Sequence, residues 1–277
     1  MARGAFGEIG EVTMHAFGYY DPTSVAKATG IAADKADGKY LAGGQSLLAA
    51  MKLSLAEPSD LIDLGRVAEL RGIKADAAAI TIGAMTRHSE VAASPEVGSR
   101  IPALAMLAGM IGDLQVRNRG TLGGSLANDD PASDYPAAAL GLGATISTEK
   151  RQIAADDFFK GLFETALAPG ELIVSVTFPV PKKAAYVKFR NPASRFAIVG
   201  VFAAQTAKGP RVAVTGAGAR GVFRVKAMEE ALARDWSPKA LDGLTVAQSE
   251  MQSDLHASAE YRAHLVSVLA RRAVAAA

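Results

Sequence analysis

The sequence predicts an α+β protein, and three patterns support that fold class. Short strand-like and helical segments alternate between residues 21 and 82, as in β-α-β units. Strand-like segments then follow one another from residue 144 to residue 215, and their short glycine- and proline-containing connections favour antiparallel pairing. Helical patterns prevail from residue 224 onwards. A chain of 277 residues can bury a large core in one domain or in two to three smaller ones.

Local signals place the elements of the first half of the chain. The run Asp21-Pro22-Thr23-Ser24 opens a helix, and the apolar spacing of residues 47–55 predicts a second helix that stops before Pro58. A strongly apolar, buried helix is expected over residues 101–113, followed by a polar bend over 115–119 and an apolar helix from Asp134 to Leu142. Strands are expected at residues 39–42, 61–64 and 79–82.

The second half changes to strands and then back to helices. A helix is expected over residues 224–234, Ser237 caps a helix start at Pro238, and Ser258 opens a last helix with apolar residues at helical spacing. Strands are expected at residues 144–148, 151–154, 172–178, 185–190, 197–206 and 211–215.

Composition narrows the class of protein. The net charge is +2, with 49% hydrophobic and 21% charged residues, which is ordinary for a soluble globular protein and lacks the basic stripe of a nucleic-acid binder. No apolar stretch is long enough to span a bilayer, so no transmembrane segment is expected. The first 14 residues lack the apolar centre of a signal peptide, so we expect a cytoplasmic protein. Residues 1–13 read as an N-terminal extension, with Met14 as a candidate start.

The chain contains no cysteine, which excludes disulfides, thiolate-ligated iron–sulfur clusters and a cysteine nucleophile. The four histidines are scattered through the sequence, so we expect no metal site. Redox chemistry in this chain would therefore require an organic cofactor.

Two glycine-rich stretches are the most informative local feature. Residues 41–48 read Leu-Ala-Gly-Gly-Gln-Ser-Leu-Leu, and residues 119–128 read Arg-Gly-Thr-Leu-Gly-Gly-Ser-Leu-Ala-Asn. Glycine reaches positive φ without steric penalty, so a Gly-Gly step can turn consecutive N–H groups toward one point, where anionic oxygen binds. Either stretch alone is better explained as a tight turn that needs glycine. Together they suit an extended diphosphate held from two sides.

A third glycine-rich stretch matches the dinucleotide fingerprint but lacks its context. Residues 216–221 follow the G-x-G-x-x-G pattern directly after an expected strand. After the helix expected at 224–234 comes another helix start, at Ser237 and Pro238, and no second parallel strand. No βαβ unit closes, so we interpret these residues as a turn from sheet to helix.

Taken together, the segments resemble the FAD-binding medium subunit of molybdenum hydroxylases, the family that includes carbon monoxide dehydrogenase and xanthine dehydrogenase. The match runs in the expected order from Phe17 to the C-terminus and includes both glycine-rich stretches. The other segments that carry it are Met51-Lys52, Leu61-Ile62-Asp63-Leu64, Ile82-Gly83-Ala84-Met85-Thr86-Arg87-His88, Gln115-Val116-Arg117-Asn118-Arg119, Asp130-Pro131-Ala132-Ser133-Asp134, residues 254–262 and Arg271-Arg272-Ala273.

The resemblance implies a two-part FAD-binding domain, with a small α/β part (residues 14–66) and a larger mixed α+β part (67–178). A C-terminal domain (179–277) with a small antiparallel sheet and a helix bundle follows. It implies that both glycine-rich stretches hold the FAD pyrophosphate, through Leu41, Ala42, Gly43, Gly44, Gln45, Ser46 and Leu47 on one side and Thr121, Leu122, Gly123, Gly124 and Ser125 on the other.

Further site residues follow from the same resemblance. Asp134 matches a contact to the ADP half of FAD, Lys188 a lysine near the flavin, and Ile173 an apolar flavin contact. By itself, a lysine at the end of a strand reads as a solvated surface group, and Ile173 as a core residue. Many relatives carry Gly-Asp before an aromatic residue near the flavin, where this chain has Ser194-Arg195-Phe196. Phe196 remains a candidate to stack on the flavin ring, while Arg195 replaces a carboxylate by a positive charge.

The expected function is electron transfer by FAD, with no catalytic residue on this chain. In this interpretation, 2Fe-2S clusters on a small partner subunit deliver electrons from a molybdenum cofactor on a large subunit. The electrons then pass to an external acceptor, a quinone or NAD, in a complex expected to be a dimer of heterotrimers. The substrate class would be carbon monoxide, an aldehyde or an N-heterocycle. Two alternatives stay open, a stand-alone FAD-dependent oxidase or reductase and a non-redox nucleotide-binding module.

Overall fold

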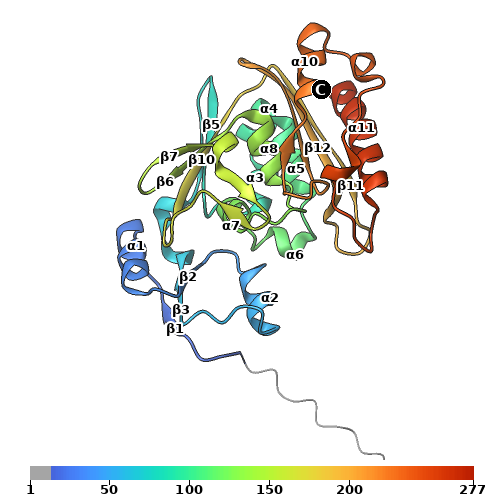
Figure 1. Cartoon of the computed structure of the whole chain (residues 1–277). Helices are drawn as coiled ribbons and strands as arrows, with labels where there is room; N and C mark the ends of the chain where they lie inside the picture. Colours follow the sequence, from blue (N-terminus) through green and yellow to red (C-terminus); the bar gives the residue numbers. More distant parts are fainter. Residues whose placement is uncertain (1–13) are drawn as a thin grey trace, which may run out of the picture.

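The computed structural model describes residues 14–277 (Figure 1), so the extension predicted for residues 1–13 lies outside the described residues. The described chain forms three main sheets with helices packed on them, which confirms the α+β class. The predicted domain boundaries stay a prediction. Within residues 14–277, no helix is both long and apolar enough to cross a bilayer.

The first sheet is small and parallel, in the order β1-β3-β2. The helix α1 (Val25–Asp34) connects β1 to β2, and it begins at Ser24, whose hydroxyl accepts a hydrogen bond from the Lys27 amide. The helix α2 ends at Lys52, earlier than predicted, because Ser54 adopts a left-handed conformation (φ +52°) that a helix cannot contain. The elements are β1 (Gly18–Tyr20), β2 (Gly38–Leu41), α2 (Leu47–Lys52), β3 (Asp60–Asp63) and the 3-10 turns Leu64–Arg66 and Ala68–Leu70.

This small sheet does not close its own core. Ala28 of α1 is buried together with Ile62 and Leu64, and the same cluster includes Met85 and Leu172 from the part of the chain that follows. The small α/β part is therefore held against the second sheet by apolar contacts.

The second sheet is antiparallel, in the order β4-β5-β10-β6-β7. Its helices include α8 (Tyr135–Leu142), which forms where an apolar helix was predicted and is buried along its entire length. The other elements are β4 (Ile73–Ala75), β5 (Ala79–Gly83), α3 (His88–Ala93), α4 (Pro95–Arg100), α5 (Pro102–Gly109), α6 (Leu114–Arg117), α7 (Leu122–Asn128), β6 (Thr145–Thr148), β7 (Gln152–Ala154), α9 (Ala155–Phe158), β8 (Phe159–Gly161), β9 (Glu164–Thr165) and β10 (Ile173–Pro179).

The third sheet, in the order β11-β12-β13-β14, is also antiparallel. Helices α10 and α11 pack on it, and α5 and α8 from the preceding part also contact its strands, so β12 is buried from Ala197 to Ala204. Figure 1 shows α11 beside β11 and β12. The elements are β11 (Lys183–Arg190), β12 (Ala197–Thr206), β13 (Gly209–Thr215), β14 (Phe223–Arg224), α10 (Lys226–Arg234), the 3-10 turns Pro238–Leu241 and Gln248–Glu250, and α11 (Ala259–Ala276).

Two predicted segments differ in the structure. The apolar helix expected over residues 101–113 ends at Gly109, and part of the expected polar bend is the short helix α6. The break occurs at Gly112 (φ +49°), after which the Asp113 carboxylate accepts a hydrogen bond from the Val116 amide and starts the new helix.

The dinucleotide-like stretch at residues 216–221 is the connection between β13 and β14. These two strands pair antiparallel, so no βαβ unit is present, which confirms the interpretation of this stretch as a turn. The turn leads into the two-residue strand β14 before α10 begins, a detail that the sequence pattern did not predict.

Candidate cofactor-binding site

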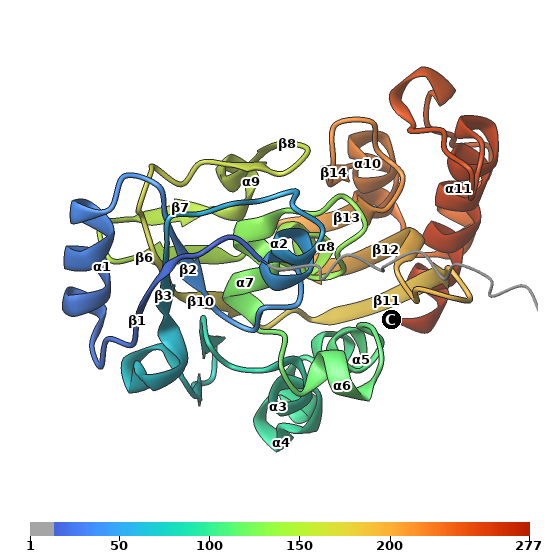
Figure 2. The ribbon, with the colours of Figure 1, turned by 90° about the horizontal axis from the view of Figure 1, so that it is seen from below.

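A cavity of about 500 Å³ lies where the small parallel sheet, the second sheet and the start of β12 meet. Residues of both glycine-rich segments line it, and Figure 2 shows the structure from the side on which α2 lies. Three predicted residues, Leu41, Leu122 and Lys188, do not line the cavity. The predicted residues that do line it are Ala42, Gly43, Gly44, Gln45, Ser46, Leu47, Thr121, Gly123, Gly124, Ser125, Asp134, Ile173 and Phe196.

The first glycine-rich segment follows β2 and presents free backbone amides. Gly44 has a φ of +72°, as predicted for a turn that needs glycine. The amides of residues 44–47 donate to no acceptor within the described part of the chain. A concave stretch of free amides at a cavity wall can bind anionic oxygen.

Gly43 is required for a different reason, which is close backbone approach. A Cβ atom on Gly43 would lie 2.3 Å from the carbonyl oxygen of Arg119 and 2.8 Å from the Cα atom of Gly120. The two glycine-rich segments therefore touch backbone to backbone, and no other residue type fits between them at this distance.

The second segment differs from the sequence prediction, which was a Gly-Gly turn with consecutive amides directed toward one point. Thr121 is the N-cap of α7, so Gly123 and Gly124 lie in its first turn, and neither has a positive φ. Their amides are already bonded, Gly123 N to the Ala84 carbonyl at 2.8 Å and Gly124 N to the Thr121 hydroxyl at 3.2 Å. The glycines of this segment present backbone without a side chain to the cavity, and the segment has no row of free amides.

Hydroxyl groups complete the polar lining near the glycines. The hydroxyls of Ser46 and Ser125 line the cavity and have no hydrogen-bond partner within residues 14–277. Together with the free amides of the first segment, they give the cavity a set of unoccupied donors. This donor set fits a diphosphate.

Asp134 and Lys188 form one buried ion pair. The Nζ atom of Lys188 donates to Asp134 Oδ2 at 2.8 Å and to the Met110 carbonyl at 3.2 Å, and the Tyr186 hydroxyl donates to the other Asp134 oxygen. Their side chains are 1% and 4% exposed, so the solvated interpretation of Lys188 is wrong. Burial raises the pKa of Asp134, and the Lys188 ammonium opposes that rise. Asp134 lines the cavity, whereas Lys188 does not line it and is connected to it only by its ion pair with Asp134.

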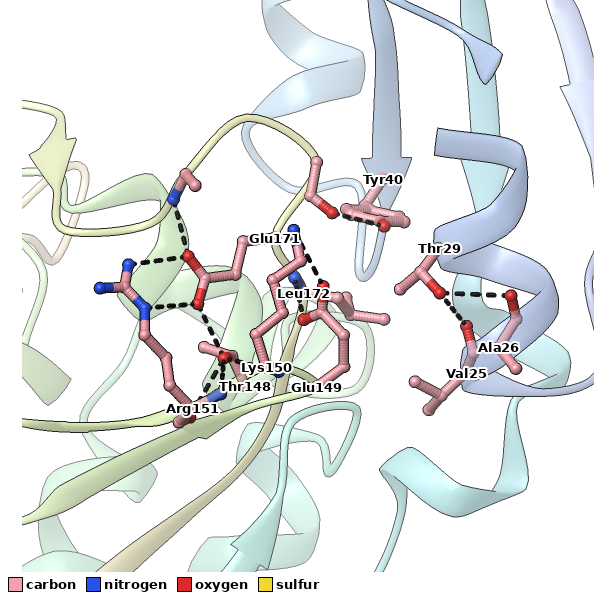
Figure 3. Close-up of polar contacts among 12 residues, drawn as sticks. Val25, Ala26, Thr29, Tyr40, Thr148, Glu149, Lys150, Arg151, Glu171 and Leu172 are labelled. Carbon is pink, nitrogen blue, oxygen red and sulfur yellow. Dashed lines mark hydrogen bonds and ion pairs between the residues drawn. The ribbon is translucent and has the colours of Figure 1, made fainter. Parts of the chain in front are cut away.

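A second polar cluster, drawn in Figure 3, lies beside β2 and includes the cavity-lining residues Tyr40, Glu171 and Leu172. The carboxylate of Glu171 accepts two bonds of 2.9 Å from Arg151, one of 2.8 Å from the Thr148 hydroxyl and one of 2.8 Å from the Ala168 amide. These bonds, that from Arg151 first, lower the pKa of Glu171 to about 2. Every lone pair of this carboxylate is used, so its role is to hold the connection before β10 in place.

The same cluster joins the small α/β part to the second sheet. The Tyr40 hydroxyl donates to the Gly170 carbonyl at 2.9 Å, and Glu149 accepts from the Leu172 amide at 2.8 Å (Figure 3). Burial and the charge of Glu149 raise the pKa of Tyr40 to about 12, so its hydroxyl remains a donor at neutral pH. The bonds place Leu172 and Ile173 against the cavity.

The loop before β12 presents Phe196 at the other end. The side-chain oxygen of Asn191 accepts bonds from the amides of Ala193 and Ser194, and Arg195 adopts a left-handed conformation with a φ of +63°. Phe196 is 49% exposed and lines both the main cavity and a neighbouring hollow of about 270 Å³. Its ring is therefore accessible from the cavity.

Sequence reasoning missed several lining residues as site residues. Met85, His88 and Val116 lie in motifs that carry the family resemblance, but no site role was predicted for them, and the others come from segments without a local pattern of their own. The missed residues are Met85, His88, Ile111, Gly112, Val116, Glu171 and Leu172.

Comparisons with known proteins agree with this geometry. Residues 15–181 match the family described as the FAD binding domain in molybdopterin dehydrogenase, and residues 184–277 match the CO dehydrogenase flavoprotein C-terminal domain. The carbon monoxide dehydrogenase medium chain of Hydrogenophaga pseudoflava is 34% identical, over 94% of this chain and 96% of its own length. The nicotine 6-hydroxylase medium subunit of Paenarthrobacter nicotinovorans is 35% identical, over 92% and 95%.

Solved structures give the same result. Carbon monoxide dehydrogenase from Hydrogenophaga pseudoflava superposes with a TM-score of 0.87, covering 96% of this chain and 98% of that chain at 34% identity. Quinoline 2-oxidoreductase from Pseudomonas putida 86 superposes with a TM-score of 0.85 at 30% identity, covering 96% and 98%. The chain thus belongs to the family of FAD-binding medium subunits of molybdenum-containing dehydrogenases.

Proposed function

We propose that this chain binds FAD in the described cavity and carries electrons from iron–sulfur clusters on a partner subunit to an external acceptor. The observation that supports this most directly is the pair of glycine-rich segments in backbone contact at the cavity wall. Beside this contact, the cavity presents free amides of the first segment and glycine backbone of the second to a bound diphosphate. FAD, when bound, supplies the electron-carrying chemistry.

The chain's own residues would bind and orient the cofactor. The amides of residues 44–47 and the hydroxyls of Ser46 and Ser125 would donate to the diphosphate oxygens. Asp134 would contact the ADP half, with Lys188 holding its carboxylate in place. Ile173 and Phe196 would contact the flavin ring and exclude water from it.

The proposed partners follow from the absence of cysteine in this chain and from the subunit names of its relatives. Because the chain contains no cysteine, it cannot ligate the 2Fe-2S clusters, which would belong to a small iron–sulfur subunit. A large subunit would hold the molybdenum cofactor and oxidise the substrate. We propose a dimer of such heterotrimers, with a quinone or NAD as acceptor. The cytoplasmic location expected from the sequence stays a prediction.

Co-expression of this chain with the genes adjacent to its own tests the proposal. The expected product is a complex of three subunits with flavin absorption, in which carbon monoxide, an aldehyde or an N-heterocycle bleaches the flavin. The isolated chain, loaded with FAD, should show no bleaching with the same compounds. A free chain that turns over a substrate by itself would instead indicate a stand-alone oxidase or reductase. A colourless chain with no affinity for FAD would indicate a non-redox module.

A further inference from the structure

A buried pair of polar side chains at the cavity wall has no role in the site described so far. His88, the first residue of α3, lines the cavity and is 5% exposed. Its ring packs against that of Tyr135, with the centroids 5.3 Å apart. The Nδ1 atom of His88 and the hydroxyl of Tyr135 are both fully enclosed, and neither has a hydrogen-bond partner within the described chain.

Unpaired buried polar atoms are uncommon in native proteins and call for an explanation. Burial raises the pKa of Tyr135, so its hydroxyl keeps its proton and can donate. Burial and the charge of Arg117 lower the pKa of His88 to about 4, so the ring is neutral and has one donor and one acceptor nitrogen. Because Nδ1 is enclosed and Nε2 is not, Nε2 is the nitrogen from which the ring can donate outward.

The Nε2 atom lies beside the second glycine-rich segment. A Cβ atom on Gly120 would be 2.5 Å from it, and both residues line the cavity. The His88 amide also donates to the Gly120 carbonyl at 3.0 Å, which ties α3 to this segment. Nε2 has no protein partner within residues 14–277 and, unlike Nδ1, is not enclosed. A neutral donor is therefore held next to the residues that would face a diphosphate.

We propose that His88 is a further cofactor-binding residue, whose Nε2–H donates a hydrogen bond to a diphosphate oxygen of bound FAD. The inference rests on the proposed FAD site. It adds a side-chain donor to a segment whose amides at Leu122, Gly123 and Gly124 are already used within the protein.

Titration of the flavin-free full-length chain with FAD, followed by flavin fluorescence, tests the inference. His88→Phe keeps a ring but removes both nitrogens, and it should raise the Kd for FAD about five- to tenfold. The affinity for ADP, measured by displacement of FAD, should fall by the same factor because ADP retains the diphosphate. His88→Gln places an amide near the position of Nε2 and should recover part of the affinity, whereas His88→Asn should not.

The outcomes separate the inference from the proposed function. A wild-type chain that does not bind FAD overturns both. A His88→Phe variant with the wild-type Kd for FAD, or one weakened for FAD but not for ADP, overturns the inference alone. If His88→Phe does not fold, ¹⁵N NMR of the wild-type chain decides. The His88 ring should carry its proton on Nε2 in the FAD-loaded state, and a proton on Nδ1 contradicts the proposal.

Discussion

The contact between the two glycine-rich segments predicts a large effect from a single methyl group. In Gly43→Ala the new Cβ atom would lie 2.3 Å from the Arg119 carbonyl oxygen, whereas ordinary contacts begin at 3.4 Å. The clashing atoms belong to the backbone, so relief requires the two segments to separate by about 1 Å. Overpacking of this kind costs about 1–3 kcal/mol.

Because the separation occurs in the cavity wall, both stability and cofactor affinity should respond. We expect the free energy of unfolding of the flavin-free chain to fall by about 1–3 kcal/mol, measured by urea denaturation. We expect the Kd for FAD to rise at least about tenfold in a fluorescence titration, equivalent to about 1.4 kcal/mol.

Gly30→Ala is a matched control for this experiment. Gly30 lies inside α1, and a Cβ atom there would meet no atom within 4 Å. Alanine favours a helix by about 1 kcal/mol over glycine, so this variant should be slightly more stable with an unchanged Kd. If Gly43→Ala matched the wild type in both measurements, the backbone contact between the segments would not exist as described.

Three further predictions concern stability and conformation. Gly44→Ala should cost about 1–2 kcal/mol because of its φ of +72°, and Gly44→Asn should cost less, by urea denaturation. Lys188→Met leaves the buried Asp134 carboxylate without its cation and should cost about 3–5 kcal/mol, most of which the added change Asp134→Asn should restore in a double-mutant cycle. The pKa of Glu171 is lowered from 4.5 to about 2, so its stabilisation of up to about 3 kcal/mol is present above pH 4.5 and lost as the pH falls toward 2. Glu171→Gln should therefore flatten the acid limb of stability against pH in that range, and an unchanged slope would contradict the assignment.

The order of helices and strands was largely predictable, because it depends on local signals. Ser24, Ser237 and Ser258, the predicted helix starts, all accept a hydrogen bond from a backbone amide in the first turn. The same local signals explain one failure. Asp113 is also an N-cap, but the apolar run before it hides the break at Gly112, so α6 was predicted as a bend.

The sequence predicted which residues line the site better than it predicted how their backbone groups are arranged there. The two Gly-Gly steps look alike in sequence, yet only Gly44 has a positive φ, while Gly123 and Gly124 belong to a helical turn. Local sequence does not show which amides already have partners, since the acceptor for Gly123 is Ala84, far away along the chain. Lys188 can be buried because it forms an ion pair with Asp134. The pattern of the strand that contains Lys188 does not reveal this partner.

The incomplete core of the small parallel sheet has a consequence for biosynthesis. Leu172, which packs in the same cluster as Ile62 and Leu64, follows them by more than one hundred residues. At a translation rate of about 5–20 residues per second, the nascent N-terminal part waits roughly 5–20 s on the ribosome before that side chain is made. During this interval its apolar surface is exposed, and it becomes a natural client for chaperones that bind emerging chains.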